Sequence, residues 1–117
     1  MKITIPGELC DLNTYIKAER TNKFISAKIK SNETARVYYS AKLSGVKKID
    51  KPVKILMKWY TINLRKDPDN TSFAKKFTND GLVLAGIIPN DTREWITGFC
   101  DEFYVDKDNP RVEIIFQ

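Results

Sequence analysis

The alternation of apolar and polar residues is clearest in KPVKILMKWYTINL, residues 51 to 64. Successive side chains of a strand point to opposite faces, so alternation indicates a sheet that is covered on one side only. Four apolar side chains share one side of this stretch: Val53, Ile55, Met57 and Trp59. The pattern predicts a strand that delivers the chain directly into Arg65, Lys66 and Asp67.

A helical pattern precedes this strand. Residues 10 to 46 contain no proline, and no glycine before Gly45, while their apolar positions fit helical spacing. We expect one long helix, or two helices with a break near Thr21 and Asn22. The opposite face carries basic side chains, which form either a solvated face or a stripe that binds phosphates. These side chains are Lys17, Arg20, Lys23, Lys28, Lys30 and Arg36.

Shorter elements flank these two segments. KITIP, residues 2 to 6, predicts a strand that ends at a proline and a glycine. Residues 71 to 86 predict a helix with Asp69 or Asn70 as its N-cap and Gly86 as its C-terminal stop. Residues 93 to 105 and 111 to 116, joined by DKDNP, predict an antiparallel hairpin. The expected fold is therefore α+β, a small mixed sheet with helices packed on it, in a single domain spanning residues 1 to 117.

Composition narrows the chemistry. Twenty basic against fifteen acidic residues give a net charge of +5, which suits a polyanionic partner but is common among soluble proteins. The chain contains no histidine, which excludes catalysis by a histidine base and ordinary zinc-histidine sites. Two isolated cysteines, Cys10 and Cys100, predict reduced thiols rather than a disulfide framework. No apolar run is long enough for a signal peptide or a membrane span, so we expect a soluble, cytoplasmic protein.

The segment RKDPDN, residues 65 to 70, places two acids around a proline. Pro68 favours an extended backbone at Asp67, and in an extended segment positions two apart point to the same side. Asp67 and Asp69 can thus present their carboxylates together, an arrangement that is costly without a cation and suits Mg²⁺ or Mn²⁺. Asp91 can join them if its loop folds back to the same edge of the sheet. The alternative is an ordinary turn whose polar side chain caps the following helix.

A lysine on the following helix is the candidate basic participant. Lys76 lies seven residues after Asp69, close to two helical turns, so an uninterrupted helix would place both on one face. Lys75 projects about 100° away from that face. The alternative is that Lys76 is an ordinary exposed helical lysine.

These residues resemble the RusA family of Holliday-junction resolvases, small endodeoxyribonucleases common in prophages. The resemblance rests on KDPDN at residues 66 to 70, a helix with Lys76 and Asp80, and LVLAGIIPND at residues 82 to 91. Near the amino end, IPG followed by LNTYIKAERTN is similar to the version in phages of Gram-positive bacteria. The likeness follows nearly the whole chain in element order. It departs in about one extra helical turn after Asn70, which leaves the choice between Lys75 and Lys76 open.

The resemblance implies that Asp67, Asp69 and Asp91 bind Mg²⁺, with Mn²⁺ as a substitute, and that Lys76 assists catalysis. It implies a phage or prophage protein that acts in the bacterial cytoplasm. It further implies a homodimer that nicks two strands of a four-way DNA junction symmetrically. Basic side chains are expected to grip the DNA backbone, and the candidates are Arg65, Lys66, Lys75, Arg20 and Lys23.

Two other functions fit the same sequence. A non-catalytic basic nucleic-acid-binding module would use the acidic turn only as a cap and would bind without Mg²⁺. A small phage interaction protein would use its basic faces only for solubility.

Overall fold

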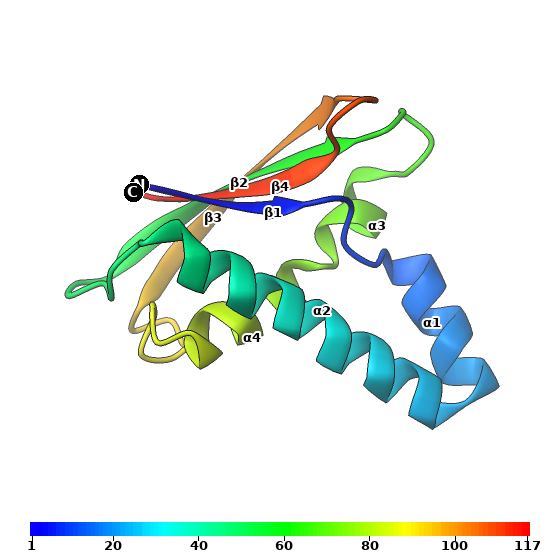
Figure 1. Ribbon diagram of the computed structural model, residues 1–117, viewed down its shortest axis with the longest axis horizontal. Coiled ribbons are helices and arrows are strands. Elements are labelled where there is room, and N and C mark those ends of the chain that lie inside the picture. The colour runs from blue at the N-terminus through cyan, green and yellow to red at the C-terminus, as the bar shows by residue number, and fades with distance from the viewer.

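Four strands and four helices make up the computed structural model, which describes all 117 residues. The sheet has the strand order β1-β4-β2-β3, and the helices lie on one of its faces (Figure 1). The predicted α+β class, with a small mixed sheet and helices packed on it, is confirmed. No helix is long and apolar enough to cross a membrane. The elements in chain order are β1 (Lys2–Pro6), α1 (Leu12–Thr21), α2 (Lys23–Ser44), β2 (Val53–Thr61), α3 (Pro68–Ser72), α4 (Lys75–Leu84), β3 (Ile96–Val105) and β4 (Arg111–Phe116).

Strand β2 is interior to the sheet and is hydrogen-bonded along both edges. It runs parallel to β3 and antiparallel to β4. The alternation predicted for this strand is confirmed, because one side is buried against the helices while the other side is exposed or half-buried. The buried side chains are Val53, Ile55, Met57 and Trp59. They belong to a core cluster of 18 residues, to which helices and all four strands contribute.

The predicted hairpin of residues 93 to 105 with 111 to 116 is wrong. Strands β3 and β4 are antiparallel to each other, but β2 lies between them. The turn from Asp106 to Pro110 crosses the end of β2, where the Asp106 N–H donates to the Thr61 carbonyl (2.8 Å). The turn therefore makes the two strands antiparallel but does not pair them with each other. The apolar strand β2 lies between them and pairs with both.

The long helical segment is divided at Asn22, where the break was expected. Asn22 is extended, and its N–H donates to the Ala18 carbonyl while its side chain accepts from the Phe24 N–H. This one residue therefore caps the end of α1 and the start of α2. Ala18 and Ser26 are both buried, and their small side chains let the two helices pack closely.

The segment after the acidic motif was predicted as one helix and forms two. The helix bends at Phe73 and Ala74, where i to i+3 hydrogen bonds replace part of the regular ladder. The bend brings the Phe73 and Phe77 rings within 5.4 and 5.9 Å of the Tyr15 ring on α1, measured between centroids. The predicted single helix is thus bent, and the bend allows these aromatic rings to pack together.

Both ends of this segment can be compared with the prediction. The N-cap position is Asp67, and neither Asp69 nor Asn70 occupies it as predicted. The predicted stop at Gly86 is confirmed. Gly86 has φ 76°, and the Ile87 N–H reaches back to the Leu82 carbonyl (3.0 Å), an arrangement that glycine favours at a helix end.

Helices α2 and α4 pack closely against each other at Gly81. A Cβ at this position would lie 2.5 Å from Val37, which is fully buried on α2. The absence of a side chain therefore permits the contact that holds α4, and with it the segment after the acidic motif, against the core.

We expect Gly81→Ala to lower the free energy of unfolding by about 1–3 kcal/mol, because the new methyl group forces the packed helices apart. Urea denaturation measures this difference. Gly98→Ala is the matched control, since its Cβ would meet only the Lys54 side chain at 3.8 Å. Equal stabilities of the two variants would contradict the close packing of α2 and α4.

Candidate functional site

Asp67 and Asp69 lie beyond the carboxyl end of β2, where α3 begins. Asp67 has the extended backbone expected before proline (φ −67°, ψ 156°), and Pro68 occupies the first turn of the helix. Both aspartates are exposed. The Asp67 side chain makes no capping hydrogen bond, and neither carboxylate takes part in an ion pair or a hydrogen bond within the chain. A capping role therefore explains the backbone of this turn but not its two carboxylates.

Asn70 links the acidic motif to the first helix. Its side-chain oxygen accepts a hydrogen bond from the Asn13 backbone N–H at the start of α1 (2.9 Å). The amide thereby satisfies one of the free N–H groups at that helix end. It fixes the position of α3 relative to α1.

Asp91 does not join the pair within one chain. It precedes β3, whose first residue pairs with Val53 at the start of β2, whereas Asp67 follows the end of β2. The two strands are parallel, so the carboxylates lie toward opposite ends of them. No group of three or more carboxylate or thiol side chains is close enough to hold a metal ion. The loop containing Asp91 therefore does not fold back to the end of β2 where Asp67 and Asp69 lie, so the expected approach of Asp91 to the pair does not occur within one chain.

The two candidate lysines have different surroundings. Lys75 Nζ pairs with Asp101 Oδ2 (2.7 Å) and lies 4.4 Å from the centre of the Phe99 ring. Asp101 also accepts from the Trp59 indole N–H (2.9 Å). Lys75 is therefore part of a structural network on β2 and β3.

Lys76 is exposed, and its one ion pair, with Asp80, is long at 3.7 Å. Its ammonium group is the freer of the two. The bend at Phe73 and Ala74 also means that an uninterrupted helical pitch does not relate Lys76 to Asp69.

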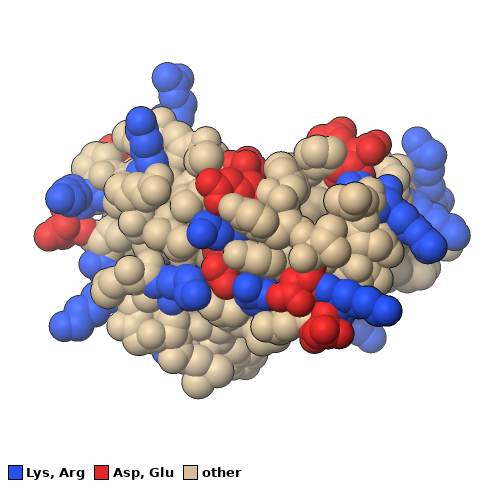
Figure 2. All heavy atoms as spheres, turned by 90° about the horizontal axis from the view of Figure 1, so that it is seen from above, with Lys and Arg blue, Asp and Glu red and all other residues tan.

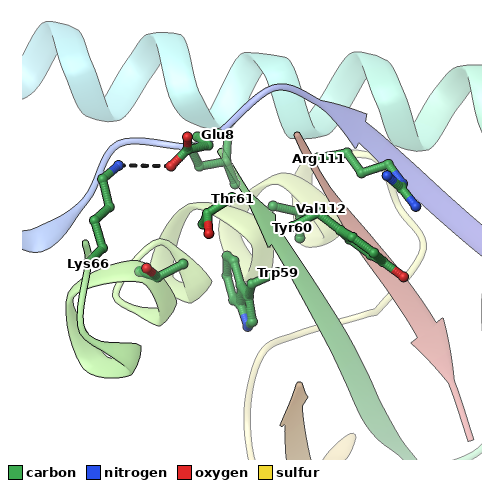
Figure 3. Close-up of a pocket in the computed structure, with 9 residues that line it drawn as sticks. Glu8, Trp59, Tyr60, Thr61, Lys66, Arg111 and Val112 are labelled. Atoms are coloured by element: carbon green, nitrogen blue, oxygen red, sulfur yellow. Dashed lines mark hydrogen bonds and ion pairs between the residues drawn. The ribbon is translucent and has the colours of Figure 1, made fainter. Parts of the chain in front are cut away.

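Lys66 connects the acidic loop to the amino-terminal segment. Its Nζ lies 3.0 Å from Glu8 Oε1 (Figure 3) and 3.0 Å from Asp11 Oδ2. Lys66 and Glu8 also border a small pocket of about 10 Å³, roughly the space of one water molecule. Lys66 was a candidate for DNA binding, but its ammonium group is occupied by two carboxylates.

These contacts change the acidities of the groups involved. Burial alone would raise the pKa of Asp11, but hydrogen bonds from Thr14 and Lys66 outweigh it, and the net pKa lies below 3.8. Burial opposes the charge of Lys66, yet hydrogen bonds to Glu8 and Asp11 raise its pKa above 10.5. Burial, followed by the charge of Glu33, raises the pKa of the nearby Cys10 thiol to about 11. Both shifts favour the charged forms, so the ion pair of Asp11 with Lys66 is charged at neutral pH.

Other basic candidates remain free. Arg65, Arg20 and Lys23 are exposed and form no ion pair. Figure 2 shows lysine and arginine side chains at both ends of the molecule, with acidic ones interspersed over its middle. Of the predicted DNA-binding residues, these three can reach a phosphate without breaking a contact.

No local pattern in the sequence indicates the partners that hold Lys66 and Lys75. Glu8 is 58 residues from Lys66, and Asp101 is 26 residues from Lys75. Arg111 was also not anticipated, although its guanidinium lies 3.7 Å from the centre of the Tyr60 ring and pairs with Asp106 and Glu113. A charged residue at the start of a strand was the one local signal for it.

No protein-family model matches this chain, and no curated protein matches it either.

We expect Lys66→Met to lower the free energy of unfolding by about 1 kcal/mol at pH 7, because two partly buried carboxylates lose their shared cation. The folded-state pKa of Asp11 is lowered, so this stabilisation exists above its unfolded pKa of 3.8 and fades as the pH falls below it. Urea denaturation at pH 7 and pH 3 measures both effects. Lys76→Met is the control, and a difference that persists unchanged at pH 3 would contradict the charge pairing.

Proposed function

We propose that this protein is a Mg²⁺-dependent endodeoxyribonuclease that cuts branched DNA as a two-fold dimer. The observation that carries the proposal is the pair of exposed, unpaired carboxylates in DPDN, beyond the carboxyl end of the interior strand β2. The resemblance of the surrounding sequence to the RusA resolvases supports the same activity.

The contrast with other acids of the chain strengthens this argument. Several other carboxylates have a cation within 3.0 Å, as Glu8, Asp11 and Asp101 do. Asp67 and Asp69 lack such a partner although they stand only two residues apart. Carboxylate oxygens of this kind suit Mg²⁺, which keeps several of its own waters. The pair would therefore supply two ligands of a metal site. Water molecules or a carboxylate of a partner subunit would supply the others.

A two-fold dimer can supply the missing carboxylate. Asp91 lies toward the opposite end of the parallel strands from Asp67, so one chain cannot complete the site as it is folded. A two-fold axis reverses one protomer relative to the other and can set the partner subunit's Asp91 beside the pair. Two equivalent composite sites would then match the approximate symmetry of a four-way junction.

The reaction would be hydrolysis of a phosphodiester bond. Asp67 and Asp69 would hold Mg²⁺, which would lower the pKa of a bound water, and that water would displace the 3′ oxygen of the DNA strand from the phosphate. From this chain, Lys76 would stabilise the extra negative charge that develops on the phosphate, and Arg65 would hold the backbone beside the cut. No covalent intermediate with the protein is required, in keeping with the absence of histidine.

The second candidate function is DNA binding without cleavage. The observation that favours it is that no three metal-binding side chains lie close together within one chain. Incubation with a synthetic four-way junction, with Mg²⁺ or with EDTA, separates the two functions on a denaturing gel. Paired nicks that require Mg²⁺ support the nuclease, whereas an intact but retarded junction supports the binding module.

Mixing two inactive variants tests the composite site. We expect Asp69→Asn and Asp91→Asn each to abolish cleavage and retain junction binding, since each removes one metal ligand. When the two are co-refolded, mixed dimers should regain one intact site, made of Asp69 from one chain and Asp91 from the other. Cleavage should then return as single nicks at a substantial fraction of the wild-type rate per intact site.

Two results would count against this arrangement. If each site lay within one chain, mixed dimers would carry one defect in both sites and would stay inactive. If Asp69→Asn alone cut at the wild-type rate with Mg²⁺, the metal assignment itself would be wrong. Co-refolded wild type and Asp69→Asn serve as the control for subunit exchange.

The two lysines should separate activity from stability. We expect Lys76→Ala to slow cleavage by about 100-fold or more with little change in stability, because its ammonium group is exposed. Lys75→Ala should instead lower the melting temperature, because it leaves Asp101 without its cation, and should slow cleavage much less. Single-turnover cleavage and thermal denaturation measure the two effects, and the reverse ranking would exchange the roles of the lysines.

A further inference from the structure

The corner between α1 and α2, residues 16 to 30, carries most of the net charge of the chain. Five basic residues and one acidic residue, Glu19, give it +4, while the whole chain has +5. The five basic side chains are all exposed and none forms an ion pair: Lys17, Arg20, Lys23, Lys28 and Lys30. This segment, called the elbow below, is therefore a concentrated site of free positive charge.

An aromatic ring stands within this charge. Phe24 is 85% exposed and has no aromatic neighbour, and Ile25 beside it is 45% exposed. Phe24 is the most exposed aromatic side chain of the protein, and it shares a helical face with Lys28, four residues later. Contact between an exposed phenylalanine ring and water is unfavourable. The place of this ring among free cations therefore points to a ligand that has both negative charge and a flat apolar surface.

The elbow holds the backbone at Phe24 in a fixed conformation. The Phe24 N–H donates to the Asn22 side chain (2.7 Å), and the Ile25 N–H donates to the Asn22 carbonyl (3.1 Å). On the other helix the Thr21 hydroxyl donates to the Lys17 carbonyl (2.8 Å). Phe24 thus projects from a capped helix start that lies far from the sheet (Figure 1) and not from a frayed terminus.

Helix α1 ties the elbow to the acidic motif. Its start is bound to that motif through Asn13 with Asn70 and through Asp11 with Lys66, and its last residue precedes Asn22. Ten helical residues span about 15 Å, which corresponds to about four nucleotides along a duplex. A DNA strand that passes the acidic motif can therefore reach the elbow.

We propose that the elbow grips branched DNA and that Phe24 stacks on bases exposed at the branch point, with the surrounding lysines on the flanking phosphates. This rests on the proposed function and adds a contact that selects branched over linear DNA. Bases at a branch point are accessible without unstacking a continuous duplex. An apolar ring can therefore stack on them directly, whereas in duplex DNA the same contact requires two base pairs to be unstacked first.

The test uses binding in EDTA, so that cleavage plays no part. A synthetic four-way junction with 2-aminopurine at the branch point is compared with a linear duplex of the same sequence. We expect Phe24→Ala to weaken junction binding about tenfold and to remove the change in 2-aminopurine fluorescence, while duplex binding changes little. Leu43→Ala is the matched control, an 88% exposed apolar side chain at the far end of the same helix.

Charge variants complete the design. The double variant Lys23→Gln with Lys28→Gln should weaken binding to both the junction and the duplex and should reduce the salt dependence of binding. The double variant Lys47→Gln with Lys48→Gln should have a smaller effect. Unchanged junction affinity in Phe24→Ala would overturn the inference, and so would an equal loss on junction and duplex. Binding to anionic lipid vesicles that Phe24→Ala abolishes, without an effect on the junction, would also overturn it in favour of a membrane contact.

These outcomes remain distinct from a failure of the proposed function. A protein that cuts the junction with Mg²⁺ while Phe24→Ala binds normally keeps its nuclease assignment and loses only the elbow contact. A protein that neither binds nor cuts the junction overturns both.

Discussion

Strand β2 is hydrogen-bonded along both edges while one of its faces is buried under the helices, and the rest of the fold is arranged around it. Its apolar side packs into the core, and its neighbours β3 and β4 differ in direction. A strand with these requirements lies inside the sheet, and the chain passes from its carboxyl end to α3 in the helical layer (Figure 1). That end delivers the chain into the acidic motif, and the position of Asp67 follows from the packing of residues well before it.

Features that depend on neighbouring residues could be predicted from the sequence. The alternation in β2, the break at Asn22, the extended backbone before Pro68 and the stop at Gly86 are all set within a few residues. Features that depend on distant partners could not be predicted. The turn before Arg111 has residues typical of a hairpin, yet both strands pair with β2 and not with each other. The helix after Pro68 has an unbroken pattern, yet it bends because Tyr15 on α1 packs against two of its rings.

The same division runs through the candidate site. The turn that carries Asp67 and Asp69 could be predicted from the sequence, but the extended backbone expected over both aspartates is confined to Asp67, because Pro68–Ser72 is helical and Asp69 lies in its first turn. The position of Asp91 depends on which strand β3 pairs with. The predicted hairpin paired β3 with β4, whereas its parallel pairing with β2 sets Asp91 toward the other end of the strands. Lysine roles follow from long-range contacts as well. Lys66 and Lys75 look like free cations in the sequence, but carboxylates 58 and 26 residues away bind them.

The free positive charge of the elbow and the two unpaired carboxylates lie near opposite ends of helix α1. Under the proposed function, the acidic pair would repel a DNA backbone unless a cation lay between them, whereas the elbow would attract it at any metal concentration. A DNA strand bound at the elbow would then reach the acidic pair along α1. The attraction of five free basic side chains would oppose the repulsion of two carboxylates, and a divalent ion would remove that repulsion where the phosphate must come closest. This placement of charge would therefore let DNA binding tolerate the absence of metal, while close approach of the phosphate would depend on it.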